Sequence, residues 1–246
     1  MYRNIRPRKV HVYCTGTPKS GTHSIAYMFK KQLRSQHEPA RDELISIFRK
    51  KQNNHTRPDR IKEMVYRREQ RLHLDVNSSC FNHIIVGELV ELFPDAKFVH
   101  PVRSPRDWLE SWINHEINHQ TCTIHQKFEP YFDKIFNKSD YRYRKDEHVL
   151  KELGLPTIEG MLSYWNAHNS KILETVPEDR LMVLRTKEIS EKKDSILQFL
   201  GLNSLDSNGN THAYKAVKKH DILSSIDSKY LNAMIARYDI DLEEWL

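Results

Sequence analysis

A glycine-containing stretch near the N-terminus, "CTGTPKSGTHS" over residues 14–24, has the residue types of an anion-binding loop. Gly16 and Gly21 allow the backbone to turn tightly and to approach a ligand closely. Amides at the start of a following helix, with the helix dipole behind them, bind phosphate. Triphosphate-binding loops end in Gly-Lys-Ser or Gly-Lys-Thr, but here Thr22 follows Gly21 and Lys19 precedes it by two residues. The loop predicts phosphate binding with a displaced lysine; a strand-to-helix turn with an exposed lysine is the alternative.

A second stretch, "VRSPRDWLES", places an arginine and a hydroxyl at a fixed spacing. Arg103 ends a predicted strand, and Ser111 follows eight residues later, two turns into a predicted helix. Ser104 is suited to cap that helix and Pro105 to occupy its first position. An arginine fork and a hydroxyl can bind one phosphate together. Taken alone, this pattern is weak evidence, because an arginine at a strand end is more often the partner of a salt bridge.

The two stretches together resemble the sulfotransferases that use 3′-phosphoadenosine 5′-phosphosulfate (PAPS). In that family a Pro-Lys-Ser-Gly-Thr loop holds the 5′-phosphosulfate, and a strand-end Arg with a Ser eight residues later holds the 3′-phosphate. The segments "YWNAHNSKILETVPEDRLMVLRTKEIS" and "SILQFLGL" also look like the family, so the resemblance spans most of residues 10–202. It implies a three-layer α/β fold, with helices flanking a central parallel sheet around a P-loop-like PAPS-binding core.

The resemblance also implies an activity and a role for each matched residue. A sulfuryl group would pass from PAPS to a hydroxyl, or less readily to an amine, of a small-molecule or lipid-like acceptor, without a metal, leaving the 3′,5′-bisphosphate product. Lys19 would stabilise the departing phosphate, Arg103 and Ser111 would hold the 3′-phosphate, and Arg185 and Thr186 would lie near the adenine. The 5′-phosphate would be held by the rest of the loop: Thr17, Pro18, Ser20, Gly21, Thr22, His23 and Ser24.

The catalytic base is less sharply defined by the sequence. Sulfuryl transfer to a hydroxyl needs a group within hydrogen-bond reach of the acceptor's proton. Some branches of the family use a Glu after the first helix, often followed by Pro, and "QHEPARDEL" places His37, Glu38 and Pro39 there. We favour Glu38, with His37 as the alternative. Another branch uses a His between the two motifs, where this chain offers Asp75 and Asn77 but no His on that loop.

This chain departs from the family pattern in two places. The cytosolic branch often carries Trp beside the adenine where this chain has His23, which keeps a flat ring. That branch also covers the 3′-phosphate with an Arg-Lys-Gly tripeptide that this sequence lacks. Lys215, Lys218 or Lys219 could replace it, although an exposed basic helix explains any one of them.

The elements that must position these residues alternate between strand and helix. A helix is predicted from residue 20 to about 35. Residues 39–71 are predicted to be helical and strongly charged, with Pro58 in the first turn of a helix. Pro101 demotes its strand or implies a bulge. Such alternation predicts a parallel sheet, with ligands bound outside the carboxyl ends of its strands. The predicted strands are "KVHVYCTG", "LHLDVNSS", "KFVHPVR" and "DRLMVLRT".

Length and composition favour one domain over residues 1–246. Residues 119–155 break the helical periodicity and are rich in aromatic side chains, so they predict a cap over the acceptor site, or else ordinary surface helices and loops. Three separated cysteines argue against a disulfide framework, and no signal peptide or membrane-spanning run is found, so a cytoplasmic protein is expected.

The net charge of +6 favours anionic partners without selecting among them. A P-loop nucleotide or small-molecule kinase is one alternative, but the Gly-Lys-Ser ending and a persuasive magnesium-binding Asp are missing from the sequence. A non-enzymatic module that binds nucleic acid or acidic lipid through basic residues 57–71 is another, and it leaves the spacing of the two motifs unexplained. No specific nucleic-acid partner is therefore expected, and the oligomeric state stays open.

Overall fold

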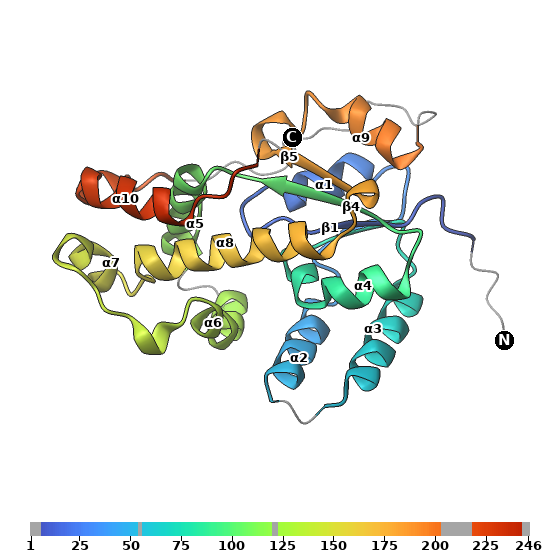
Figure 1. The fold of residues 1–246 in the computed structure, drawn as a ribbon, viewed down its shortest axis with the longest axis horizontal. Coiled ribbons are helices and arrows are strands. Elements are labelled where there is room, and N and C mark those ends of the chain that lie inside the picture. The colour runs from blue at the N-terminus through green and yellow to red at the C-terminus, as the bar shows by residue number, and fades with distance from the viewer. Residues whose placement is uncertain (1–5, 54–55, 120–122, 203–217, 243–246) are drawn as a thin grey trace.

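A five-stranded parallel sheet forms the centre of the protein (Figure 1). The fold is seen in a computed structural model, which describes residues 6–53, 56–119, 123–202 and 218–242. The strand order is β2-β3-β1-β4-β5, and each neighbouring pair is parallel. This confirms the parallel α/β sheet predicted from the sequence. The strands are β1 Val12–Cys14, β2 Ser35–His37, β3 Val76–Ser78, β4 Lys97–Val102 and β5 Leu181–Arg185.

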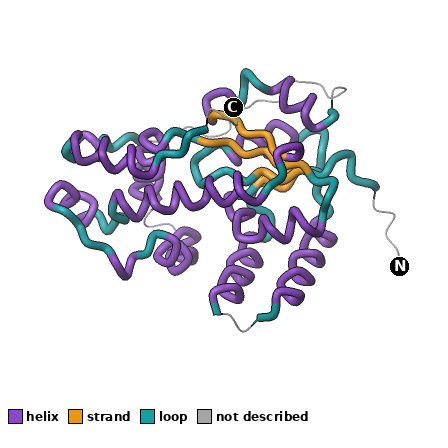
Figure 2. Tube along the Cα trace, in the orientation of Figure 1, coloured by secondary structure: helices purple, strands orange, loops and turns teal. Residues whose placement is uncertain are grey.

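Helices connect the strands and cover both faces of the sheet (Figure 2). Short 3₁₀ turns join several of them, and one of these, Cys80–Ile85, leads directly into α4. In the described ranges the α-helices are α1 Thr22–Phe29, α2 Arg41–Gln52, α3 Pro58–Leu72, α4 Val86–Leu92, α5 Pro105–His119, α6 Thr123–Ile135, α7 His148–Glu152, α8 Ile158–Thr175, α9 Lys193–Leu200 and α10 Ser228–Tyr238.

Alternate residues of the central strand face two separate apolar layers, as a pleated strand requires. Val12 and Cys14 pack with Ile25 of α1 and Ile196 of α9 on one face. Tyr13 packs on the other face, in the layer that contains α4 and α8. All three β1 side chains are fully buried, as expected for a strand covered on both sides. The three-layer arrangement is therefore confirmed (Figure 1).

The predicted helix over residues 20–35 was wrong in its second half. α1 ends at Phe29, and after a turn the chain forms the edge strand β2. The Asp75 carboxylate accepts hydrogen bonds from the amide of Arg34 and from its guanidinium, which ties Arg34 to the start of β3. Leu33 still enters the apolar layer beside α1. The helical spacing of apolar residues continues to Leu33, but pairing with β3 makes the end of this segment a strand instead of a helix.

The predicted bulge or edge position at Pro101 was also wrong. β4 lies between β1 and β5, and Pro101 pairs in regular register with Leu184. The Thr15 amide donates to the Val99 carbonyl, so the backbone polar groups of Val99 face β1. Because these groups alternate in direction along a strand, those of Pro101 face β1 as well. β1 has already ended at Cys14, so the amide that proline lacks has no strand partner to lose.

The aromatic segment over residues 119–155 folds into α6, α7 and short 3₁₀ turns. Phe128, Tyr131 and Phe136 are buried in the apolar layer that also contains Trp112 and Tyr164. Their burial explains the aromatic composition of this segment by packing. Across the described residues, no helix combines the length and the apolar character needed to cross a bilayer.

Candidate functional site

A cavity of about 1350 Å³ opens at the carboxyl ends of the strands. The chain leaves β1 toward β2 and β3 but leaves β4 toward β5, so the loops after β1 and β4 diverge. Such a divergence creates a crevice in which open α/β sheets bind ligands. Twelve of the residues predicted from the sequence line this cavity: Pro18, Lys19, Gly21, Thr22, His23, Ser24, His37, Glu38, Arg103, Ser111, Arg185 and Thr186.

Thr17 and Ser20, the other two predicted site residues, lie beneath the loop and not among the residues that line the cavity. Both are fully buried. The Ser20 hydroxyl donates to the Thr17 carbonyl at 2.6 Å, and the Ser20 amide donates to the same oxygen at 3.1 Å. The Thr17 hydroxyl is buried without a hydrogen-bond partner. The Ser20 side chain therefore supports the turn from inside.

The two glycines of the loop are required for different reasons. A Cβ on Gly16 would lie 2.6 Å from the Pro101 carbonyl oxygen, so only glycine permits this approach to β4. Gly21 has a φ of 105°, and a Cβ there would also collide with Ile189. Helix α1 begins at the next residue, and the amides of a first helical turn point out of the helix end. The loop therefore directs backbone donors toward the cavity.

Two buried indoles, which the sequence analysis did not single out, fix the two motifs. The Trp108 Nε1–H on α5 donates to the Pro18 carbonyl at 2.7 Å. The Trp165 Nε1–H on α8 donates to the Arg103 carbonyl at 3.1 Å. The first contact joins the loop after β1 to the helix after β4, so the two motifs are held in one geometry. Trp108 lies inside the second motif, and this position is the feature of the sequence that could have identified it as a site residue.

Lys19 and Arg103 bring two positive charges into the cavity. Burial, and then the charge of Arg103, lowers the pKa of Lys19 below its ordinary value, while Glu116 acts in the opposite direction. Burial also lowers the pKa of Arg103, opposed by Asp107 and Glu110. Both shifts mean that the surroundings disfavour the positive charge, so an anionic ligand would relieve an existing electrostatic cost.

The predicted base candidates lie at the end of the edge strand β2. The His37 Nε2 is 3.2 Å from the Thr22 hydroxyl, which connects β2 to the start of α1. Burial is the largest cause that lowers the pKa of His37, so this ring is neutral at pH 7. The Glu38 carboxylate accepts from Arg41 at 3.1 Å and from the Cys80 thiol at 3.4 Å. Arg41, which also lines the cavity, was not anticipated from the sequence.

The third region considered for the base lies elsewhere. Asp75 precedes β3, at the amino end of the sheet, and its carboxylate is 2.9 Å from the Arg34 guanidinium. Asn77 is buried and donates to the Glu69 carboxylate. Neither residue is among those that line the cavity, whereas Glu38 and His37 both are.

The C-terminal part of the chain closes another side of the cavity. Lys219 lines it and lies 3.7 Å from Glu110 of α5. Residues 239–242, which follow α10, line it too and were not predicted. Lys218 is described but is not among the lining residues, whereas Lys215 lies outside the described residues.

A column of buried histidines lies beneath the glycine loop. His168 Nε2–H donates to the Thr15 carbonyl at 2.7 Å, and His100 Nδ1 is 3.1 Å from the Thr15 hydroxyl. The His83 ring centroid is 4.3 Å from that of His168. Burial lowers the pKa of His83 and of His100 to about 4 and that of His168 well below its usual value. Within the described ranges, no three His, Cys, Asp or Glu side chains are grouped to hold a metal.

Comparison with known protein families identifies the class of this chain. The model of the sulfotransferase domain matches residues 11–207, which include β1, both motifs and all five strands. The chain therefore belongs to the sulfotransferase family, as the resemblance of its motifs predicted.

Individual relatives are more distant. Ava biosynthesis cluster protein M of Aspergillus versicolor is 29% identical over 111 residues, which are 42% of this chain and 40% of that protein. The match thus spans less than half the length of that relative. The crystal structure of a sulfotransferase from Alicyclobacillus acidocaldarius has a TM-score of 0.52 at 16% identity, and the alignment covers 98% of this chain and 99% of that one. At this identity the comparison supports a shared fold.

Proposed function

We propose that the protein transfers a sulfuryl group from PAPS to a hydroxyl group of a small molecule. The observation that carries this proposal is the convergence of the α1 N-terminus, Lys19 and Arg103 on one cavity from the ends of β1 and β4. Arg103 raises the electrostatic cost of the positive charge on Lys19, and two cations placed in this way are suited to a ligand with several negative charges. A nucleotide with phosphates at both its 3′ and 5′ positions has that charge pattern.

The residues of the cavity fit such a nucleotide in three parts. Lys19 and the amides of the first turn of α1 would hold the 5′ end. Arg103 and Ser111 would hold the 3′-phosphate through a guanidinium fork and a hydroxyl. Arg185 and Thr186, at the end of β5, would lie beside the base, and the Thr186 hydroxyl already donates to the Ser20 carbonyl at 2.6 Å. The β5 end is thereby joined to the loop that holds the 5′ end.

When bound, PAPS supplies a sulfuryl group whose bond to the 5′-phosphate oxygen breaks, with the electron pair passing to that oxygen. The Lys19 ammonium group would stabilise the resulting negative charge, together with the helix amides. Because these donors are fixed before the reaction, little reorganisation is needed when the charge develops. The remaining requirement is a group that takes the proton of the attacking hydroxyl.

Glu38 is our proposed base, with His37 as the alternative. The Glu38 carboxylate lies in the cavity and forms an ion pair with Arg41 at 3.1 Å. His37 is neutral at pH 7 because burial lowers its pKa, so its ring could also accept a proton. Its Nε2, however, is already within hydrogen-bond distance of the Thr22 hydroxyl.

The proposed acceptor end of the cavity is polar. His23, His37, Glu38 and Arg41 surround the approach to Lys19. Covering these groups with a hydrocarbon chain would cost free energy, since polar groups would lose water without gaining partners. A small polar alcohol or phenol is therefore favoured over a lipid-like acceptor, and a relative named for a biosynthesis cluster is compatible with a small molecule.

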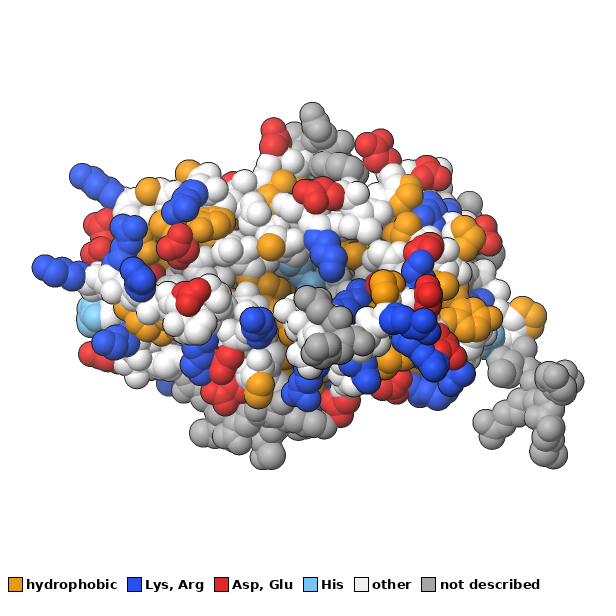
Figure 3. Space-filling view, turned by 60° about the horizontal axis from the view of Figure 1, so that its bottom comes forward, with side chains coloured by type: hydrophobic (Ala, Val, Ile, Leu, Met, Phe, Trp, Pro, Cys, Tyr) orange, Lys and Arg blue, Asp and Glu red, His pale blue; other side chains and the backbone are white. Residues whose placement is uncertain are grey.

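The nucleic-acid alternative receives less support from the surface. Basic residues of α3 pair with neighbouring carboxylates: Arg60 and Arg67 with Glu63, and Lys62 with Glu91. On the face shown in Figure 3, basic and acidic side chains are interspersed. A phosphate backbone binds best to a continuous basic surface, which mixed pairs do not provide.

Thermal unfolding with three ligands separates the classes. Adenosine 3′,5′-bisphosphate, ATP with magnesium, and a short oligonucleotide would each be added at saturation. A ligand at about 100 times its dissociation constant stabilises a protein by roughly 2.7 kcal/mol. We expect the bisphosphate to raise the melting temperature most. A response to ATP with magnesium and none to the bisphosphate would refute the proposal.

The acceptor can then be sought with sulfur-labelled PAPS and a panel of alcohols, phenols, sugars and amines. Transfer of label to a hydroxyl compound is the expected result. If the bisphosphate binds but label passes only to amines, the donor assignment stands and the acceptor assignment fails.

A further inference from the structure

The segment that carries Glu38 has an unusual backbone. Glu38 has a φ of 48° and Ala40 a φ of 45°, so two residues that are not glycine adopt the left-handed conformation on either side of Pro39. Such a conformation costs roughly 1–2 kcal/mol per residue, because Cβ approaches the following carbonyl oxygen. Conformations of this kind persist where the surrounding structure holds them. Something outside this turn must therefore fix it.

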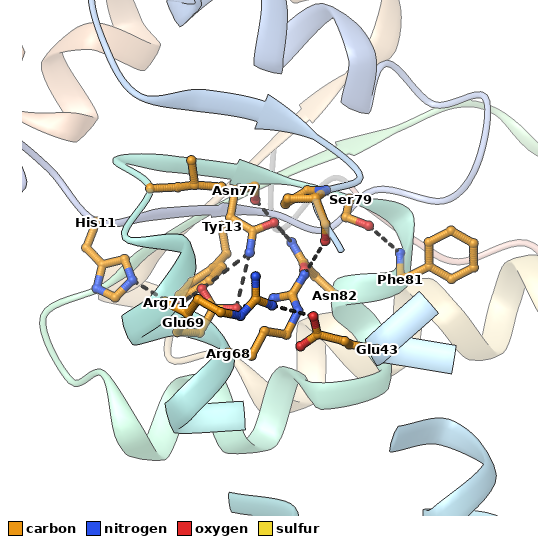
Figure 4. Close-up of polar contacts among 12 residues, drawn as sticks. His11, Tyr13, Glu43, Arg68, Glu69, Arg71, Asn77, Ser79, Phe81 and Asn82 are labelled. Atoms are coloured by element: carbon orange, nitrogen blue, oxygen red, sulfur yellow. Dashed lines mark hydrogen bonds and ion pairs between the residues drawn. The ribbon is translucent and has the colours of Figure 1, made fainter. Parts of the chain in front are cut away.

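Besides the hydrogen bond from the Glu38 amide to the Ser78 carbonyl at 2.8 Å, the turn is restrained by a buried arginine on α3. The Arg68 Nη2 donates to the Pro39 carbonyl, and its Nη1 pairs with the carboxylate of the adjacent Glu69. The exposed fraction of Arg68, and also of Glu69, is 1%. Figure 4 shows the guanidinium of Arg68 among Tyr13, Glu69 and Asn77 beneath the strands.

Glu69 in turn is fixed by the sheet. Its carboxylate accepts from the Tyr13 hydroxyl of β1 at 3.1 Å and from the Asn77 amide of β3 at 3.3 Å. The arginine is thus anchored to β1, whose following loop lines the cavity, and to β3, which pairs with β2. One chain of contacts runs from the sheet through Glu69 and Arg68 to the turn.

Stability alone is a poor explanation for this pair. Removing two charges from water costs several kcal/mol per ion, and apolar residues of similar volume often stabilise a protein equally well. An apolar side chain could not, however, donate to the Pro39 carbonyl. What the charged pair adds is a directed hydrogen bond onto the strained turn.

We propose that Arg68, held by Glu69, is a positioning residue that keeps the Glu38–Ala40 turn in its left-handed form and so directs the Glu38 carboxylate into the cavity. The proposal rests on the proposed function only in its catalytic consequence, because the hold on the turn can be measured without turnover. Arg41 and Cys80 orient the Glu38 side chain, whereas Arg68 acts on the backbone.

The test uses a variant in which both buried charges are replaced. Arg68→Met alone would leave the Glu69 charge buried without its partner and could prevent folding. Arg68→Met with Glu69→Gln removes both charges, while the Gln oxygen can still accept from Tyr13 and Asn77. Arg71→Met is the matched control: it lies on the same helix, is exposed, and pairs with Glu43 rather than the turn (Figure 4). Arg68→Lys is a milder second variant.

Hydrogen–deuterium exchange of the peptide over residues 35–44 is the first readout. Loss of a hydrogen bond from a charged donor predicts about tenfold faster exchange in this peptide. We expect that increase in the double variant, a smaller one in Arg68→Lys, and none in Arg71→Met. Unchanged exchange in this peptide, or a uniform increase along the whole chain, would overturn the proposal.

Kinetics of the best acceptor from the panel above is the second readout. In the double variant we expect kcat to fall about tenfold while the affinity for adenosine 3′,5′-bisphosphate stays unchanged, since the loop after β1 is untouched. Full kcat with faster local exchange would overturn the catalytic consequence. Failure of the wild-type protein to bind the bisphosphate would instead refute the proposed function, and the exchange result would still decide whether Arg68 holds the turn.

Discussion

The loop after β1 and the turn after β2 meet in the same cavity, and both contain left-handed backbone, but they are fixed in different ways. The loop has Gly21 at a φ of 105°, where glycine carries no steric cost, and its Lys19 has a φ of 66°. The turn has Glu38 and Ala40 in the left-handed region and contains no glycine. The glycines of the loop allow part of its shape locally, and Trp108 and Thr186 hold it from other elements, whereas the turn has no glycine and depends on contacts from other elements.

The supports beneath them differ in charge as well. Under the loop lie His100 and His168, which burial keeps neutral at pH 7. Under the turn lies the ion pair of Arg68 and Glu69. Neutral histidines do not repel the positive charge of Lys19. The Arg68 guanidinium, in contrast, pairs with Glu69 through one nitrogen and donates a hydrogen bond to the Pro39 carbonyl through the other. The comparison shows that one cavity can combine a loop with recognisable glycine positions in the sequence and a turn whose conformation depends on contacts with residues far away in the chain.

The largest expected effect comes from the turn. Glu38→Gln should reduce turnover roughly 10²–10⁴-fold, because the proton acceptor is lost. Binding of adenosine 3′,5′-bisphosphate, measured by calorimetry, should change little. Glu43→Gln, an exposed carboxylate on α2, is the control. Full activity in Glu38→Gln together with inactive His37→Gln would move the role of base to His37.

The loop should give the next largest effect. Lys19→Ala is expected to lower kcat roughly 10²–10³-fold, since charge on the departing phosphate loses its fixed cation. The measurement is single-turnover transfer of labelled sulfuryl. Lys30→Ala, just after α1, should behave as the wild-type protein. Normal turnover without Lys19 would contradict its assignment.

Arg103 should affect binding more than chemistry. Arg103→Ala removes a charged hydrogen-bond donor, which is worth about 1.5–3 kcal/mol, so the affinity for the bisphosphate should fall roughly 10–100-fold. Affinity for adenosine 5′-phosphate, which has no 3′-phosphate, should be nearly unaffected. Arg106→Ala, three residues further on at the start of α5 and hydrogen-bonded to Asn232, supplies the control. Equal losses for both nucleotides would argue against a 3′-phosphate contact.

Acid should weaken the support beneath the loop. His83 and His100 have pKa values of about 4 in the fold, below their ordinary 6.5, so they stabilise the fold above pH 6.5 and lose that contribution as the pH falls toward 4. At pH 5 each contributes on the order of 2 kcal/mol less, which lowers the melting temperature by roughly 10 °C in total. Calorimetric scans from pH 7.5 to pH 5 measure this. A flat profile would mean that these histidines are not held neutral.

The smallest effect compares the two left-handed segments directly. Ala40→Gly should stabilise the protein by roughly 0.5–1 kcal/mol, since glycine removes steric strain at a φ of 45°. Gly21→Ala should instead destabilise it, because a Cβ would collide with Ile189. Urea unfolding measures both. A destabilised Ala40→Gly would show that the turn is not strained.

Much of the loop half of the cavity was predictable because its signals are local. Gly16, Gly21 and Lys19 lie within a few residues of each other, and Arg103 and Ser111 share one strand–helix connection. The strand and helix that flank each motif also follow from apolar periodicity. The α/β class and the position of the site at the carboxyl ends of the strands follow from these patterns.

The other half could not be predicted in the same way. The three residues of β2 do not read as a strand, and they pair only because Asp75 ties Arg34 to the start of β3. Arg68 reads as one of several surface arginines on α3, and only the packing of that helix buries it. Trp108 and Trp165 read as core residues, although their indoles also bind the carbonyls of Pro18 and Arg103.

The sequence by itself determined the class of fold, the family, and the residues that surround a proposed nucleotide, because short-range spacing and backbone requirements encode them. The tertiary structure decided where β2 pairs, how a turn without glycine stays left-handed, and which charges are buried beneath it. Those features depend on contacts between residues some thirty positions apart, such as Arg68 and Pro39. Such contacts arise only when the layers pack, so no local pattern records them.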